Sequence, residues 1–257
     1  MELLNSNIIG EGEKNLLILH GFLGMGDNWK THAKNLAEKG YCVHLIDQRN
    51  HGKSFWSEDF SYKFMVEDLK FYMDHHQIST TILLGHSMGG KTAMNFALRY
   101  SQLVEKLIIV DISPRYYPPH HENILAALMS LDFQVIRSRK RAEEQLSNYI
   151  SDLGTRQFLL KNLHWLENGK LGLKINIEVL KNSGEAIGQA VSCDKVFDKP
   201  TLFMIGSNSN YVDKSSDNHM IKSYFLKTEM IEIEGAGHWP HAEQPKIFFH
   251  HLISWLN

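Results

Sequence analysis

A serine between two glycines stands at a junction in the stretch TTILLGHSMGGKTAMNFALRY, residues 80–100. The residues before it are mostly β-branched or leucine and those after it favour helices, so the serine lies where a strand turns into a helix. Gly85-x-Ser87-x-Gly89 in that setting predicts a nucleophile elbow, a sharp turn whose glycines let the strand and the helix pass closely. We therefore expect Ser87 to be a nucleophile.

A second loop is expected to face this serine. The stretch LILHGFLG, residues 17–24, reads as a strand followed by a glycine-containing loop. The backbone N–H groups of Phe22 and Met88 are the candidates for an oxyanion hole, which holds the negative oxygen of a tetrahedral intermediate. We interpret His20 as a residue that fixes the loop and does not transfer protons.

A histidine near the carboxyl terminus is the candidate base. In AGHWPHAEQP, residues 236–245, His238 lies in a glycine-containing loop after the last predicted strand. That position allows it to accept the proton of Ser87 and to return it to a leaving group. His241 is the alternative, but it lies where the terminal helix is approached.

The elements that must position these residues can be read from the apolar pattern. Apolar runs without strict alternation predict buried strands at residues 15–21, 41–47, 80–86, 106–113, 200–206 and 229–235. Helical spacing separates them, at residues 28–40, 62–78, 91–102 and 245–257. Alternation of this kind predicts an α/β fold with a parallel sheet covered on both faces.

Residues 114–190 break this rhythm. They read as helical, without a convincing buried strand, and predict a helical cap inserted over the sheet. The charge run RSRKRAEE, residues 137–144, is interpreted as the solvated amino end of a helix. We expect one domain over residues 1–257, with its core at 1–113 and 191–257.

Composition narrows the possible partners. The 257 residues include 27 basic and 29 acidic ones, a formal net charge of −2, and no long run of one sign. Nucleic acid is therefore not expected as a partner. No apolar run approaches the ~18 residues of a membrane span, and the amino terminus lacks a basic segment followed by an apolar one. No membrane association is expected.

The cysteines and histidines give no metal signature. Cys42 and Cys193 are expected to be buried free thiols, which fits a cytoplasmic location. The 15 histidines include adjacent pairs without zinc-site spacing, and we interpret most histidines as surface residues. No metal is expected.

These motifs resemble those of the α/β-hydrolase fold superfamily, in which nucleophile, acid and histidine follow in that order. Within it the chain is similar to the YbfF-like and ABHD11-like esterases. The motifs that carry this resemblance are GHSMGGKTAM (85–94), VDISP (110–114), RQFLLKNL (156–163) and AGHWPHAEQP (236–245). The resemblance covers essentially the whole chain and implies a mostly parallel sheet with helices on both faces and a helical cap.

The acid is harder to place. In many superfamily members it follows the penultimate strand, at the position where this chain has Ser209, so the common pattern fails here. Asp111, at the end of the predicted strand 106–113, and Asp213, in the later loop, are the two candidates. The resemblance favours Asp111, which is the aspartate of VDISP, and this would complete a Ser-His-Asp triad.

The expected function is a serine hydrolase that cleaves short- to medium-chain acyl esters or thioesters through an acyl-enzyme, without a cofactor. The resemblance adds acyl-CoA thioesters as candidate substrates. The substrate is expected to enter between the cap and the strand ends, where Phe158, Trp165 and Trp239 are candidate contacts. A lyase or a carbon–carbon bond hydrolase with the same triad is an alternative, and so is a non-catalytic homologue that binds small molecules. The sequence does not predict the oligomeric state.

Overall fold

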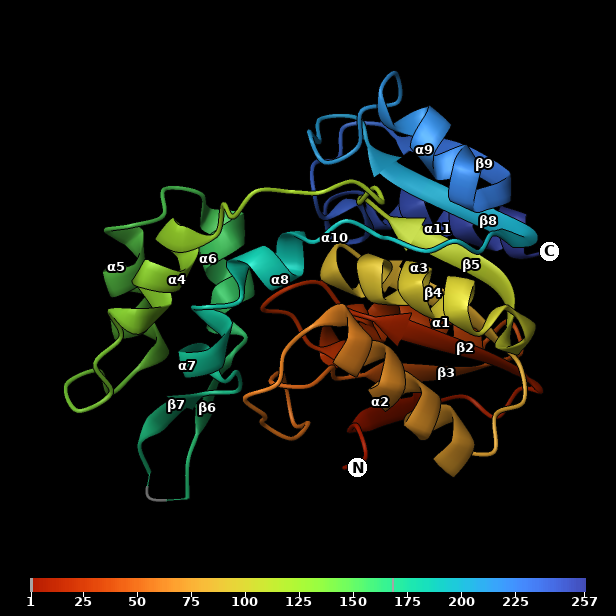
Figure 1. Ribbon diagram of the computed structural model, residues 1–257. Coiled ribbons are helices and arrows are strands. Elements are labelled where there is room, and N and C mark those ends of the chain that lie inside the picture. The colour runs from red at the N-terminus through yellow and green to blue at the C-terminus, as the bar shows by residue number, and fades with distance from the viewer. Residues whose placement is uncertain (1, 168) are drawn as a thin grey trace.

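A seven-stranded sheet forms the centre of the molecule in the computed structural model, which describes residues 2–167 and 169–257 (Figure 1). The strands, in spatial order, are β1 (Ser6–Ile9), β3 (Tyr41–Ile46), β2 (Lys14–Leu19), β4 (Thr81–His86), β5 (Val104–Val110), β8 (Phe197–Gly206) and β9 (Phe225–Ile233). All neighbours pair in parallel except β1, which runs antiparallel to β3. The predicted α/β class is therefore confirmed.

Helices cover both faces of this sheet. In β2, Leu17 and Leu19 belong to one apolar cluster and Leu16 and Ile18 to another, because successive side chains point to opposite faces. The first cluster includes side chains of α2 (Tyr62–His75), α3 (Met88–Arg99) and α9 (Asp217–Tyr224). The second includes side chains of α1 (Lys30–Ala37) and α11 (Pro245–Leu256). Burial on both faces explains why the strands read as continuous apolar runs.

The short edge strand β1 was not predicted. It has four residues, Ser6–Ile9, none of which is fully buried, and it pairs with β3 from Ser6 opposite Ile46 to Ile9 opposite Val43. A strand this short, at an edge and half exposed, leaves no apolar run in the sequence. Its existence depends on the free edge that β3 offers.

Residues 114–190, the cap, form a separate layer beside the strand ends, green to teal in Figure 1. Its helices are α4 (Glu122–Met129), α5 (Arg139–Ser147), α6 (Leu153–Leu160), α7 (Ile177–Leu180) and α8 (Gly184–Gly188). The sequence showed no convincing buried strand here, but the segment does contain a short, partly buried antiparallel hairpin of β6 (Leu163–Trp165) and β7 (Leu171–Leu173). A strand of three residues is too short for its alternation of buried and exposed side chains to be recognised in the sequence.

The cap has its own apolar core, and this core extends into the main body. Leucines of the cap such as Leu128, Leu146 and Leu159 share one cluster with Phe22 and Met88 of the core. Those two residues were predicted to form the oxyanion hole. The packing therefore places the cap directly over the serine turn.

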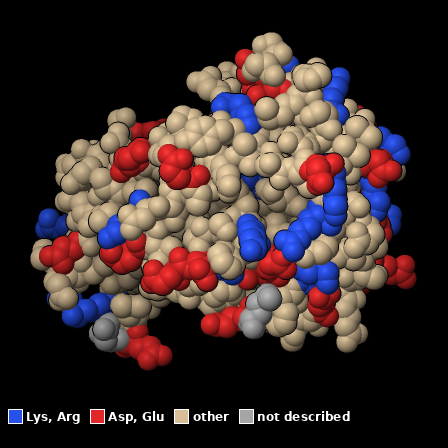
Figure 2. Space-filling view, viewed as in Figure 1, with Lys and Arg blue, Asp and Glu red and all other residues tan. Residues whose placement is uncertain are grey.

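The polar residues divide between surface and interior. Basic and acidic groups lie interspersed on the face shown in Figure 2. The adjacent histidine pairs are at least partly exposed, but six single histidines are buried: His20, His32, His44, His51, His86 and His241. Cys42 and Cys193 are free, as expected, but they are only partly buried and not buried as predicted. Within residues 2–167 and 169–257, no helix has the length and apolar character needed to cross a membrane.

Candidate active site

Ser87 occupies the turn between β4 and α3 with φ 52° and ψ −118°. Its N–H donates to the carbonyl of Val110 at 3.0 Å, which holds the turn against β5. A Cβ on Gly85 would lie 2.2 Å from the carbonyl oxygen of Gly89, and a Cβ on Gly89 would lie 2.3 Å from that of Leu19. Both positions therefore require glycine, as a nucleophile elbow does.

His238 lies in the loop after β9, and its Nε2 is 3.0 Å from Ser87 Oγ. Two contacts hold this loop. His86 donates from Nε2 to the carbonyl of His238 at 2.8 Å. The Glu243 carboxylate accepts from the backbone N–H groups of Gly237 and Trp239, at 2.7 and 3.0 Å. The imidazole is thus fixed at hydrogen-bond distance from the serine.

Asp111 follows β5 and is fully buried. Its Oδ2 is 2.8 Å from His238 Nδ1, and its Oδ1 accepts from the N–H of Gly206 at 3.0 Å. The hydroxyl of Ser209 donates to Oδ2 at 2.5 Å. Ser209, which stands where many superfamily members carry the acid, here supports a carboxylate from the neighbouring strand end. Both oxygens of this buried carboxylate therefore have hydrogen-bond partners.

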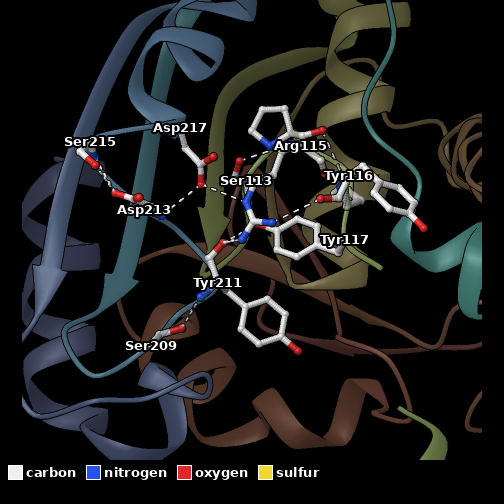
Figure 3. A network of polar contacts seen from close by, with 11 residues as sticks. Ser113, Arg115, Tyr116, Tyr117, Ser209, Tyr211, Asp213, Ser215 and Asp217 are labelled. Carbon is white, nitrogen blue, oxygen red and sulfur yellow. Dashed lines mark hydrogen bonds and ion pairs between the residues drawn. The ribbon is translucent and has the colours of Figure 1, made fainter. Parts of the chain in front are cut away.

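The two rival residues lie elsewhere. The exposed carboxylate of Asp213 accepts from the backbone N–H and the hydroxyl of Ser215, at 2.8 and 2.6 Å, and these bonds lower the pKa of Asp213 to about 2 (Figure 3). His241 is buried and stacks on Trp29, with ring centroids 3.9 Å apart. The structure therefore brings Asp111 and His238, and not these two residues, to Ser87.

The candidate oxyanion donors are buried beside the serine. Phe22 is 8% exposed and Met88 1%, and neither backbone N–H has a hydrogen-bond partner in the part of the chain that the structure describes. His20 accepts from the N–H of Gln48 at Nε2, 3.0 Å away, and contacts the carbonyl of Gly21 from Nδ1 at 2.8 Å. Burial lowers the pKa of His20 to about 4. Its contacts agree with the predicted role in fixing the loop.

Tyr211 is a site residue that the sequence did not reveal. Its ring stacks on His238 with centroids 3.6 Å apart and an interplanar angle of 16°. Its hydroxyl lies 2.6 Å from His120 Nε2, and its carbonyl accepts from the hydroxyl of Tyr117 at 2.5 Å. Figure 3 shows how this residue joins the loop after β8 to the segment that enters the cap. In the loop GSNSNYVD, residues 206–213, an isolated tyrosine gives no sequence pattern that would predict this contact.

A pocket of about 180 Å³ opens at Ser87 between the cap and the strand ends. Phe158 of α6 and Trp239 line it, with ring centroids 5.5 Å apart. Trp165 does not line it. This residue is 57% exposed, because the β6–β7 hairpin carries it away from the serine. The other lining residues are Phe22, Leu23, His86, His120, His121, Ile124, Thr155, Leu159, Tyr211 and His238.

A second, smaller cavity of about 20 Å³ meets the first at Ser87. Tyr62, Ile112, Tyr117 and Ile187 are among its lining residues. A volume of about 10–15 Å³ accommodates one water molecule, so this cavity has room for a group of one or two heavy atoms. The hydroxyl of Ser87 therefore faces two spaces of unequal size.

Comparison with known proteins identifies the class. A model described as alpha/beta hydrolase fold matches residues 14–157, more than half of the chain. The chain belongs to the α/β-hydrolase fold family. It is 38% identical to sn-1-specific diacylglycerol lipase ABHD11 of Danio rerio, over 96% of this chain and 80% of that protein. It is 31% identical to Esterase YbfF of Escherichia coli, over 94% of this chain and 92% of that protein.

A solved structure supports the same grouping. The structure titled "Marine microorganism esterase" superposes with a TM-score of 0.96 at 39% identity, over 99% of this chain and all of that one. Together with the curated relatives, this places the chain among the YbfF- and ABHD11-like esterases of the family.

Proposed function

We propose that this chain is a serine esterase in which Ser87 is the nucleophile, His238 the general base and acid, and Asp111 the residue that orients His238. One observation carries the proposal: Ser87 Oγ, His238 Nε2 and Nδ1, and Asp111 Oδ2 are joined by contacts of 3.0 and 2.8 Å at the mouth of an apolar pocket. Each group lies within the hydrogen-bond reach that proton transfer needs.

The reaction follows from these contacts. Ser87 Oγ forms a bond to the carbonyl carbon of the ester while its proton passes to His238 Nε2. The N–H groups of Phe22 and Met88 stabilise the resulting oxyanion. The intermediate collapses, the carbon–oxygen bond to the alcohol breaks, and His238 gives its proton to that alcohol. Water then attacks the acyl-enzyme by the same route, and the carboxylic acid and free Ser87 are released.

The lining favours an uncharged acyl group. No lysine, arginine, aspartate or glutamate lines the larger cavity within the described residues, and Phe158, Ile124 and Leu159 supply apolar surface. The unequal cavities suit an ester with one small and one longer substituent. This supports short- to medium-chain esters, and thioesters react by the same steps. The charged part of an acyl-CoA would have to stay outside the cavity.

The two alternatives use the same residues differently. A lyase or carbon–carbon bond hydrolase would keep the triad but would be nearly silent on simple esters, and a binding protein would leave Ser87 unreactive. The small, mostly apolar pocket and the names of the relatives favour ester hydrolysis. A cytoplasmic location is part of the proposal and rests on the two free cysteines.

The test combines labelling with turnover. A fluorophosphonate probe should label the wild-type protein at Ser87, and p-nitrophenyl esters from acetate to octanoate should be hydrolysed. Ser87→Ala should abolish labelling and lower kcat by about 10³-fold or more while leaving the circular dichroism spectrum unchanged. Activity within tenfold of wild type in this variant would exclude Ser87 as the nucleophile. Labelling without turnover on any ester would favour the lyase alternative.

A further inference from the structure

Lys91 is a buried lysine that the proposed reaction does not use. It lies in the first turn of α3, four residues after Ser87, and is only 1% exposed. Its Nζ meets main-chain carbonyls: it donates to Arg115 O at 2.5 Å, to Gln189 O at 2.7 Å and to Pro114 O at 3.4 Å. An ammonium group has three N–H donors, so these three carbonyls match its full capacity.

The three carbonyls belong to the two segments that connect the core to the cap. We call residues 113–121, between β5 and α4, the first crossing, and residues 189–196, between α8 and β8, the second crossing; both can be followed in Figure 1. Pro114 O also accepts from the N–H of Val191 of the second crossing, at 2.8 Å. The two crossings therefore lie side by side above Lys91.

Glycine allows this close approach. The N–H of Tyr117 donates to the carbonyl of Gly188 at 2.8 Å, next to the second crossing. A Cβ on Gly188 would lie only 1.9 Å from the carbonyl oxygen of Tyr117. The glycine at position 188 thus allows the two crossings to approach closely enough for Lys91 to reach carbonyls of both.

The contacts of Lys91 extend towards His238. Its Nζ lies 5.0 Å from the centre of the Tyr117 ring, a cation–π distance. The Tyr117 hydroxyl accepts from the N–H of Ser113 at 2.9 Å and donates to the carbonyl of Tyr211. Tyr211 in turn stacks on His238. The first crossing therefore ties α3 to the loop that packs against the candidate base.

We propose that Lys91 is a positioning residue that fixes the cap over Ser87 by holding both crossings against α3. A cap joined to the core by two segments can shift as a unit if those segments are loose. Such a shift would move Phe158 and Leu159, which line the pocket from α6, relative to Ser87. Retaining a cation at this depth is costly unless its donors are satisfied, and burial with Arg115 nearby lowers the pKa of Lys91 to about 7.

A matched control is available in the chain. Lys199 also donates from Nζ to two main-chain carbonyls, Ser101 O and Val104 O, both at 2.8 Å. It lies in β8, three residues after the second crossing, and its partners are Ser101, which follows α3, and Val104, the first residue of β5. None of these partners belongs to either crossing. Lys91→Met and Lys199→Met therefore remove the same kind of contact at two places, of which only one touches the cap.

The experiment measures hydrogen–deuterium exchange by mass spectrometry on both variants and the wild type. In Lys91→Met, peptides covering 113–121 and 189–196 should exchange at least tenfold faster, while peptides of β2, β4 and β5 stay unchanged. Lys199→Met should leave both crossings at the wild-type rate. The kinetic arm rests on the proposed function: in Lys91→Met, KM for p-nitrophenyl octanoate should rise about tenfold, and kcat/KM for the acetate should stay within about threefold.

The outcomes separate this inference from the proposed function. Unchanged exchange in both crossings of a folded Lys91→Met would overturn it, and so would equal losses on acetate and octanoate. If wild-type protein hydrolysed no ester, the proposed function would fail and the exchange result alone would decide. Lys91→Gln, which retains N–H donors, should be intermediate. If both Lys91 variants failed to fold while Lys199→Met folded, the role of Lys91 would lie in forming the core.

Discussion

Ser87 and Asp111 hold backbone conformations that L-residues rarely adopt, with φ of 52° and 50°. Each continues a sheet ladder by one N–H, Ser87 to Val110 O at 3.0 Å and Asp111 to Met204 O at 2.9 Å. The backbone then turns sharply, so that both side chains leave the strand ends on the same edge of the sheet. Strain of about 1–3 kcal/mol at each residue is typical of functional turns, and the surrounding ladders hold it in place.

Changing the acid to its amide tests which aspartate serves His238. Asp111→Asn has one oxygen, which cannot accept both from Gly206 N–H and from His238 Nδ1–H as the carboxylate does. The imidazole should lose its preferred tautomer, and kcat should fall by about 10³- to 10⁴-fold. Asp213→Asn changes an exposed loop residue and should cost less than about tenfold. Steady-state kinetics on a p-nitrophenyl ester measures both.

Folding controls decide how such losses are read. Each variant needs a near-ultraviolet circular dichroism spectrum like that of the wild type, because a displaced loop after β8 would imitate a catalytic loss. An inactive Asp213→Asn beside an active Asp111→Asn would place the acid after the later strand and contradict the assignment.

The residues that sequence analysis located are those whose role imposes a local pattern. The elbow of Ser87 needs its two glycines, and the loop of His238 follows a strand. Tyr211 acts through stacking on a histidine 27 positions away along the chain, which no local pattern records. The contacts of Lys91 could not be predicted from the sequence either. Its three partners are main-chain carbonyls, which every residue type carries.

At the level of elements, the central strands were predictable and the short ones were not. Strands buried on both faces must be apolar throughout, so β2, β4 and β5 stand out in the sequence. The hairpin of β6 and β7 has three residues in each strand and forms only because the cap core buries Leu163 and Leu171. The cap region that reads as helical in the sequence is also divided at Asp152. This residue is the N-cap of α6, and its carboxylate accepts from the N–H of Thr155 at 2.6 Å.

Two aromatic residues of the cap should differ in their effect on substrate choice. Phe158 lines the pocket and meets Trp239, whereas Trp165 is exposed on the hairpin. Phe158→Ala should shift the chain-length preference, because each methylene in apolar contact contributes about 0.8 kcal/mol at most. Trp165→Ala should leave the preference unchanged. The ratio of kcat/KM for octanoate to that for acetate measures the shift.

Two outcomes would contradict the different roles expected for Phe158 and Trp165. Equal losses on every chain length in Phe158→Ala would give that residue a purely structural role in the cap core. A changed preference in Trp165→Ala would show that the hairpin reaches the substrate after all. Trp165→Ala also controls for the general cost of removing a large side chain from the cap.

Across the whole molecule, the buried histidines couple stability to pH. His20 and His51 are at most 1% exposed, and His44 is 4% exposed. Burial lowers the pKa of His20 and His44 to about 4 and that of His51 to about 3, with further lowering of His51 by the charge of His20 and of His44 by that of His76. These side chains are therefore neutral in the folded protein at neutral pH, where they serve as hydrogen-bond partners within the interior.

The direction of the pH effect follows from these shifts. In the unfolded chain a histidine binds a proton below about pH 6.5, whereas His20, His44 and His51 in the folded protein do not until pH 3–4. Between those values the unfolded state binds more protons, so the free energy of unfolding falls as pH falls. This contribution to stability is fully present above about pH 6.5. Each histidine contributes a slope of at most about 1.4 kcal/mol per pH unit.

These three histidines alone therefore predict that the free energy of unfolding, measured by urea titration, falls by about 4 kcal/mol between pH 7.5 and pH 5.5. His44→Gln removes one titrating group while leaving an amide near Tyr72, whose hydroxyl lies 2.7 Å from His44 Nδ1. The variant loses some stability at pH 7.5, but its fall between the two pH values should be smaller by about 1 kcal/mol, because one fewer site gains a proton on unfolding. An equal fall in wild type and His44→Gln would show that His44 is already protonated in the folded state.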